Sequence, residues 1–151
     1  KEIRGRLEEE FGAELEAEDC LVTSGGTSEA FRWVLHVPAV DYRQPDPEMG
    51  GPTGPGRVRS CVRAFLREAA SLASKNDLEG KLVVATPLLG AGAGGLGPVV
   101  SLEAMMGAVR DSPEESKSIG ELVFVVLKPE DARLVESGAS KLGFKLEQRR
   151  P

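Results

Sequence analysis

The sequence predicts an α/β fold, and two features of the chain carry that prediction. The first is a pair of continuous apolar runs, KLVVATPLL at residues 81–89 and ELVFVVL at residues 121–127. Runs without polar alternation are typical of parallel strands that are buried on both faces. The second is that segments with helical spacing flank both runs. Strands that alternate with helices predict right-handed crossovers, with helices on both faces of the sheet.

The first part of the chain predicts one helix and two strands. In KEIRGRLEEEFG, Ile3, Leu7 and Phe11 share one helical face, and Gly12 suits a left-handed cap. CLVTS at residues 20–24 and RWVLHVPAV at residues 32–40 are rich in β-branched and aromatic residues, so we expect strands. Because no initiator methionine and no N-cap residue precede the helix, we expect a fragment of a longer protein.

Residues 41–57 are rich in proline and glycine, which disfavour regular structure. Met49 is the only apolar anchor in this stretch apart from its aromatic start. We therefore expect a long mobile surface loop from Asp41 to Arg57 that tolerates deletion of Gly50 to Gly56.

The second half predicts three helices around the two apolar strands. A helix begins at Val58 and ends in SKNDLEG, and its buried face is Val58, Val62, Phe65, Leu66, Ala69 and Leu72. SLEAMMGAVR forms a short helix capped by Ser101, whose methionines we expect in the core. Pro129, Glu130 and Asp131 begin a final helix that ends at Leu142, with Gly143 as its stop.

Composition limits the class of protein. The chain has 151 residues, 40% of them hydrophobic and 28% charged, which predicts a single domain over residues 1–151. A net charge of −5 without a basic block predicts no dedicated nucleic-acid surface, and no apolar run approaches the ~18 residues of a membrane span. Cys20 and Cys61 lack a CxxC or Cys/His spacing, so we expect two reduced thiols in a cytoplasmic or nuclear protein, and no metal site.

The stretch TPLLGAGAGGLGP, residues 86–98, holds five of the chain's 18 glycines and joins an expected strand end to a helix start. Ligands of open α/β sheets bind beyond the carboxyl ends of the strands. Glycines let successive amides converge on an anion, so this stretch is a candidate phosphate site. The alternative is a turn kept free of side chains for tight packing. No Gly-Lys-Ser/Thr follows, and no acidic residue of a dinucleotide fingerprint is found, so ordinary nucleotide folds are excluded.

The order of these segments resembles the macro domain, an ADP-ribose-binding fold, and most closely its macro-histone type. The resemblance is carried by WVLHVPAV (33–40), KLVVATPLLGAGAGGLGP (81–98), SLEAMMGAV (101–109) and ELVFVVLKPEDARLVESGASKL (121–142). It implies a three-layer α/β/α domain with a mixed, mostly parallel sheet. The ligand-binding residues that it implies are Leu89, Gly90, Ala91, Gly92, Ala93, Gly94, Gly95 and Leu96 at the diphosphate and distal ribose, and Leu127 near adenine. We call residues 89–96 the glycine loop.

The resemblance also implies features that this chain lacks. The family's first strands, its adenine-recognising acidic residue, its Asn-rich motif and its first phosphate loop would precede Lys1. One missing strand would lie in the middle of the sheet, so we expect self-association or a need for an N-terminal partner segment. No aromatic residue stands among Ala93 to Leu96 or at Leu127, where many members stack one on the ligand. Each loss removes roughly 0.5–1.5 kcal/mol, so we expect weak affinity.

Outside the glycine loop, the candidate residues favour structural roles. His36 is the only histidine, and we interpret it as a packed strand residue rather than a general acid or base. Asp41 and Tyr42 follow that strand and could reach a ligand, although a solvated loop start fits them better. Cys61 is a small buried hydrophobe, and Glu8 to Glu10 form a solvated helix face.

Three functions remain open. The first is a binding module for ADP-ribose or an ADP-ribosylated protein, and such a module needs no cofactor. If this is the function, Gly94→Val should weaken binding with little loss of stability, and Gly138→Ala is the control. The second is a mono-ADP-ribosyl hydrolase, although that chemistry would depend on residues before Lys1. The third is a degenerate macro fold used for protein contacts.

Overall fold

The computed structural model describes residues 2–144, which form helices and strands in the alternating order predicted from the sequence. The helices are α1 (Glu2–Phe11), α2 (Pro55–Lys75), α3 (Pro98–Arg110), α4 (Pro113–Lys117) and α5 (Pro129–Lys141). The strands are β1 (Leu21–Ser24), β2 (Trp33–His36), β3 (Leu82–Pro87) and β4 (Ile119–Val125). The α/β fold class is confirmed. The short helix α4 is an element that the sequence analysis missed.

The strands form two separate two-stranded sheets within residues 2–144, where the sequence analysis predicted one mixed, mostly parallel sheet. β1 and β2 pair antiparallel, with Leu21 opposite His36. β3 and β4 pair parallel, with Val84 opposite Leu122, and the register shifts once between Leu82 and Val83. Because β3 and β4 run in the same direction, the connections that follow them leave from the same edge of the sheet.

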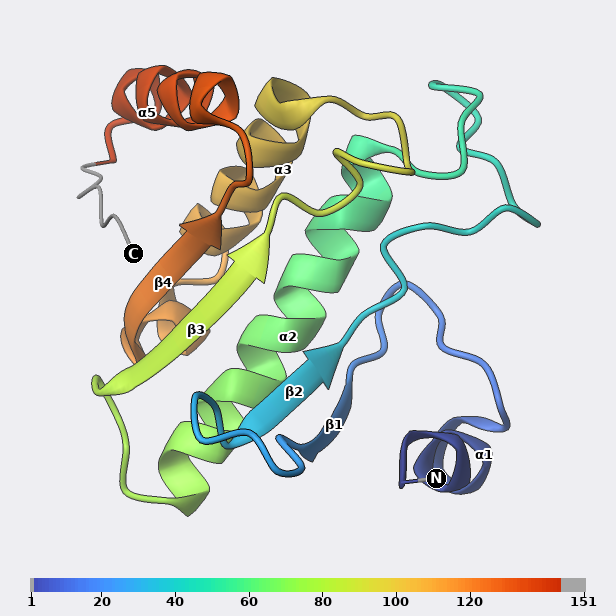
Figure 1. Cartoon of the computed structure of the whole chain (residues 1–151), viewed down its shortest axis with the longest axis vertical. Helices are drawn as coiled ribbons and strands as arrows, with labels where there is room; N and C mark the ends of the chain where they lie inside the picture. The colour runs from blue at the N-terminus through green and yellow to red at the C-terminus, as the bar shows by residue number, and fades with distance from the viewer. Residues whose placement is uncertain (1, 145–151) are drawn as a thin grey trace.

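The helices cover one side of the β3–β4 pair. Figure 1 shows α2 and α3 side by side behind the strands, α5 packed against α3, and α1 next to β1. The face of α2 that was predicted to be buried is buried, except that Leu72 is half-buried. Leu102, Met105 and Met106 of α3 are also buried, so both methionines belong to the core. The core therefore lies between α2, α3 and the rear face of the strands.

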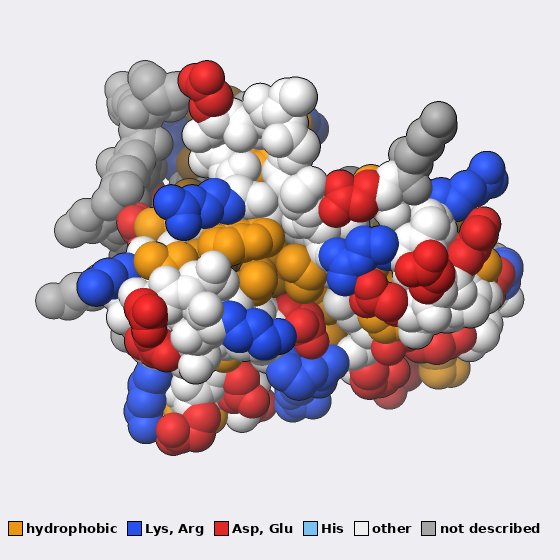
Figure 2. Space-filling view, turned by 90° about the horizontal axis from the view of Figure 1, so that it is seen from below, with side chains coloured by type: hydrophobic (Ala, Val, Ile, Leu, Met, Phe, Trp, Pro, Cys, Tyr) orange, Lys and Arg blue, Asp and Glu red, His pale blue; other side chains and the backbone are white. Residues whose placement is uncertain are grey.

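The opposite face of β3 and β4 is exposed, so the prediction that both strands are buried on both faces is wrong. Val83 of β3 is 57% exposed and Val125 of β4 is 49% exposed, and Leu127 beyond β4 is 95% exposed. No helix of residues 2–144 lies over these side chains, which is the physical reason for their exposure. We call Val83, Val125 and Leu127 the open sheet face. Figure 2, seen from below the view of Figure 1, shows hydrophobic side chains gathered in a patch with charged side chains around them.

The proline- and glycine-rich stretch is shorter and better anchored than predicted. α2 begins at Pro55, so the last residues of the expected loop are helical, and Pro55 occupies the first helical position, where proline fits without losing a hydrogen bond. Thr53 is 1% exposed, and the Asp41 amide donates a hydrogen bond of 2.7 Å to the Pro52 carbonyl. The expectation of an unanchored loop through Arg57 is therefore wrong.

Several helix ends agree with their predicted signals. Gly12 has a φ of 64° after α1, and Gly143 has a φ of 81° after α5, as left-handed caps require. Pro129 begins α5, with two acidic residues in its first turn.

None of the helices in residues 2–144 has the length and apolar character that a membrane-spanning helix needs.

Candidate functional site

The glycine loop lies between the carboxyl end of β3 and the start of α3, as the sequence predicts. Its backbone turns back on itself, because the Leu96 amide donates to the Gly90 carbonyl at 3.1 Å and the Gly95 amide donates to the Gly92 carbonyl at 3.0 Å. Gly90 and Gly95 both have a φ of 75°, a conformation that favours glycine. These contacts fix the shape of the loop through its backbone alone.

Three successive amides of this loop have no acceptor. Among the residues that the structure describes, none accepts a hydrogen bond from the amides of Gly92, Ala93 or Gly94. α3 follows directly, with Gly97 as its N-cap, no side-chain cap and no acidic residue in its first turn. Free amides beside a helix N-terminus carry partial positive charge, so this region can bind an anion without a lysine or arginine.

The predicted ligand-binding residues of the glycine loop fall into three groups by exposure. Gly92, Ala93 and Gly95 are exposed, and Leu89, Gly90 and Ala91 are half-buried. Gly94 is buried, and Leu96 is 5% exposed within the core cluster. The side chain of Leu96 therefore faces the protein interior rather than the outer surface of the loop.

Leu127 lies at the same edge of the sheet, in the connection from β4 to α5. Its side chain is almost fully exposed and is not among the residues that pack against the core.

A second segment, residues 51–54, lies against the glycine loop, and the sequence analysis missed this contact. A Cβ built on Gly94 would lie 2.6 Å from the Thr53 Cγ2 atom and 2.6 Å from the Gly90 carbonyl oxygen. A Cβ built on Gly51 would lie 3.7 Å from the Gly94 carbonyl oxygen. Gly94 is thus required for packing, which corrects the expectation that Gly94→Val would spare the fold. The two segments lie far apart in the sequence, so no local sequence pattern indicates their contact. The only local signal is Pro55, which marks the start of the helix that follows.

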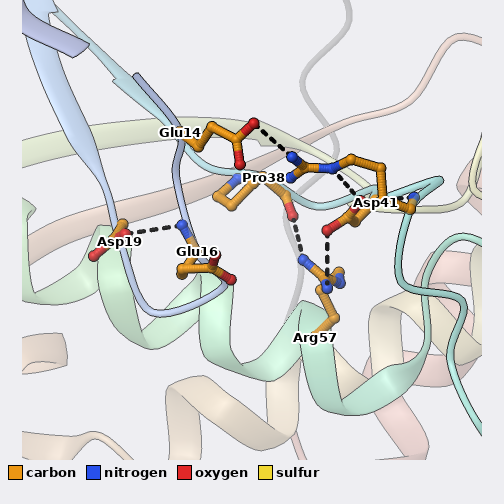
Figure 3. A network of polar contacts seen from close by, with 7 residues as sticks. Glu14, Glu16, Asp19, Pro38, Asp41 and Arg57 are labelled. Carbon is orange, nitrogen blue, oxygen red and sulfur yellow. Dashed lines mark hydrogen bonds and ion pairs between the residues drawn. The ribbon is translucent and has the colours of Figure 1, made fainter. Parts of the chain in front are cut away.

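An ion-pair network anchors the start of the same stretch (Figure 3). Arg57, in the first turn of α2, lies 3.7 Å from the Asp41 carboxylate and donates to the Pro38 carbonyl at 3.4 Å. Arg43 donates to Asp41 at 3.3 Å and lies 2.6 Å from a Glu14 carboxylate oxygen. The Arg43 amide, which donates to the Asp41 carboxylate, and the two guanidinium groups lower the pKa of Asp41.

This network supports neither of the two interpretations of Asp41. Its side chain is 9% exposed, so it is not a solvated loop residue, and its carboxylate is engaged by two arginines. Tyr42, by contrast, is 72% exposed. The charge of Arg57 is likewise satisfied within the protein, so it is not a free cation for a ligand.

The remaining candidates have structural partners. His36 Nε2 lies 2.9 Å from Thr23 Oγ across β1 and β2, which supports its structural interpretation. Cys20 and Cys61 are free and buried, and burial raises the pKa of their thiols to about 12 and about 11. Glu8 to Glu10 are exposed, as predicted. Across residues 2–144 no group of three potential metal ligands comes together.

Comparison with solved structures identifies the fold. The chain is similar to the Oceanobacillus iheyensis macrodomain with ADP, at 18% identity and a TM-score of 0.68, over 91% of this chain and 65% of that one. A mutant of that macrodomain with ADPR gives 18% identity and a TM-score of 0.68, over 91% and 66% of the two chains. A second mutant gives 16% identity and a TM-score of 0.71, over 93% and 65%. The three-layer α/β/α macro-like fold is therefore confirmed.

The chain spans 65% of the length of the first of these macrodomains. None of the curated protein sequences matches it. Residues 3–105, more than half of the chain, match the sequence profile of the Macro domain. By its sequence and by its fold, the chain belongs to the macro domain family.

Proposed function

We propose that this chain is a binding module for ADP-ribose or an ADP-ribosylated protein, and that the glycine loop holds the diphosphate. The observation that carries the proposal is the set of three free amides at Gly92, Ala93 and Gly94, beside the N-terminus of α3. The macro domain family binds ADP-ribose, and one of the similar structures holds ADPR. An anion of this kind matches the free donors of the loop.

The chemistry of the site favours the diphosphate over other parts of the ligand. Amide hydrogen bonds to an ionised phosphate are charge-assisted, and each contributes about 1.5–3 kcal/mol. The adenine end would meet only the aliphatic side chain of Leu127, which provides no stacking ring. Affinity should therefore come mainly from the diphosphate, and it should be modest.

One observation favours a second function, protein contacts. The open sheet face exposes Val83, Val125 and Leu127, and exposed apolar patches often mark interaction surfaces. This surface lies mainly on the strands, whereas the free amides lie in the glycine loop, and Leu127 is the residue that both proposed functions would use.

Calorimetric titration with ADP-ribose, ADP and adenosine tests the proposed ligand. We expect heat of binding with ADP-ribose and ADP, and none with adenosine, because only the first two carry a diphosphate. Binding of adenosine as tightly as ADP would contradict a diphosphate site. Absence of binding by ADP-ribose at millimolar concentration would overturn the proposal and leave protein contacts as the function that the structure favours.

A further inference from the structure

Thr53 has a buried hydroxyl without a hydrogen-bond partner. The residue is 1% exposed, and among residues 2–144 its Oγ1 atom has neither a donor nor an acceptor within reach. The other buried threonines differ, since Thr23 bonds to His36 and Thr86 donates to the Pro87 carbonyl. An unpaired buried hydroxyl is unfavourable for folding, so a native protein that keeps one needs a reason for it.

The position of Thr53 supplies that reason. The side chain lies directly under the glycine loop: a Cβ built on Gly90 would be 3.4 Å from Thr53 Oγ1, and a Cβ built on Gly94 would be 2.6 Å from its Cγ2. Because both loop residues are glycines, no side chain at these two positions lies between the hydroxyl and the backbone of the loop. Thr53 is therefore a polar side chain placed at the inner surface of the loop.

The same loop holds unpaired donors of its own. The amides of Gly92, Ala93 and Gly94 have no acceptor in the described part of the chain. A hydroxyl and three amides without partners, gathered around one short backbone segment, are the donors that a phosphate group with several oxygens can satisfy together. Arg57, in the first turn of the helix that follows Thr53, is paired with Asp41 and is therefore not a free cation for the phosphate.

We propose that Thr53 is a further binding residue of this site, whose hydroxyl donates a hydrogen bond to a phosphate oxygen of the ligand. Because Thr53 is 1% exposed, this contact requires the Gly90–Gly94 backbone to shift when the ligand binds. This inference rests on the proposed function for the identity of ADP-ribose, but its chemistry requires only a phosphate or diphosphate.

Two substitutions at Thr53 test the role of the hydroxyl. Thr53→Val keeps the shape and removes the hydroxyl, whereas Thr53→Ser keeps the hydroxyl and removes the methyl group that packs under the loop. By calorimetry, we expect Thr53→Val to weaken ADP-ribose binding by about tenfold or more, and Thr53→Ser to restore most of it. The melting temperature of ligand-free Thr53→Val should equal or exceed that of the wild type, because an unpaired hydroxyl is lost.

Thr23→Val is the matched control, because it removes an equally buried hydroxyl that has a partner and lies on β1. It should lower the melting temperature by leaving His36 unpaired and should leave ADP-ribose binding unchanged. A lower melting temperature of ligand-free Thr53→Val would show that its hydroxyl already has a partner, and the inference would be wrong.

Titration with inorganic pyrophosphate separates this inference from the proposed function. If the wild type binds ADP-ribose and Thr53→Val binds it equally well, the role of Thr53 is refuted while the proposed function stands. If the wild type binds pyrophosphate but not ADP-ribose, and Thr53→Val loses that binding, the role of Thr53 stands while the proposed ligand is wrong. Binding of neither compound refutes both.

Discussion

Replacing Gly92 with valine would test whether the free amides of the glycine loop hold a ligand. The φ of Gly92 lies outside the left-handed region, and a Cβ at this position meets no heavy atom within 4 Å. The fold therefore does not require glycine here, and the free energy of unfolding should change by no more than about 0.5 kcal/mol. Because no protein atom occupies this space, it is open to a phosphate approaching the amides.

The expected loss of affinity follows from the hydrogen bonds that the valine side chain would displace. Each amide bond to a charged phosphate contributes about 1.5–3 kcal/mol, so losing two of the three removes about 3–6 kcal/mol. Every 1.4 kcal/mol corresponds to about tenfold, so the dissociation constant for ADP-ribose should rise by about 100-fold or more. Calorimetry measures the affinity, and thermal unfolding measures the stability of the same samples.

Gly94→Val provides the contrast within the same loop. Its Cβ would overlap Thr53 Cγ2 and the Gly90 carbonyl oxygen, both at 2.6 Å, so the surrounding backbone must shift. Overpacking of this kind costs about 1–3 kcal/mol, which lowers the melting temperature of a domain of this size by roughly 2–12 °C. If Gly92→Val binds ADP-ribose as the wild type does, the amides do not hold the ligand and the reasoning fails.

The neutral control for both variants is Gly5→Ala on α1, where a Cβ also meets no heavy atom within 4 Å. It should preserve binding. Gly138→Ala, the control expected from the sequence, is unsuitable, because its Cβ would lie 2.8 Å from the Leu102 Cδ2 atom.

Three further predictions concern the rest of the molecule. The pKa of Asp41 is lowered from its ordinary value of 3.8, so its ion pairs stabilise the protein above that pH and are lost as the pH falls through the lowered pKa. Between pH 6 and about 2.5, the melting temperature should therefore fall less steeply for Asp41→Asn than for the wild type. Equal slopes for the two proteins would contradict this. Limited proteolysis should cut within residues 42–50 before residues 51–57, which are better buried, and the reverse order would show that the anchoring is misplaced. The open sheet face should cause concentration-dependent self-association in sedimentation, and Val83→Lys should reduce it; a monomer at all concentrations would exclude this role.

The sequence predicted those parts of the fold that depend on local periodicity. The stripe of α2 and the caps at Gly12 and Gly143 were found where expected, because a helical face and a left-handed cap are each specified by a few neighbouring residues. The glycine loop was also predicted at the carboxyl end of β3, since a strand end followed by a helix start fixes its place.

Features that depend on distant segments were not predicted. The burial of Thr53 depends on the glycine loop, which lies almost forty positions further along the chain, and a composition of proline and glycine gives no sign of it. The apolar pattern of β3 correctly indicated a strand, but periodicity does not show whether a second layer covers Val83. The orientation of Leu96 toward the core also required the structure, because the loop reverses direction within a few residues.

Leu127 links the two surfaces that the structure leaves available. It lies beyond β4 at the edge of the sheet where the glycine loop begins, and it follows Val125 by two residues on the open sheet face. A ligand whose diphosphate occupies the loop and whose adenine reaches Leu127 would cover part of that face, and so would a protein bound to the strands. Because both events change the surroundings of one side chain, they are thermodynamically coupled, and each must alter the affinity of the other by the same factor. If both partners need to cover Leu127, this coupling is negative, and an ADP-ribosyl ligand would then release the protein contact rather than add to it.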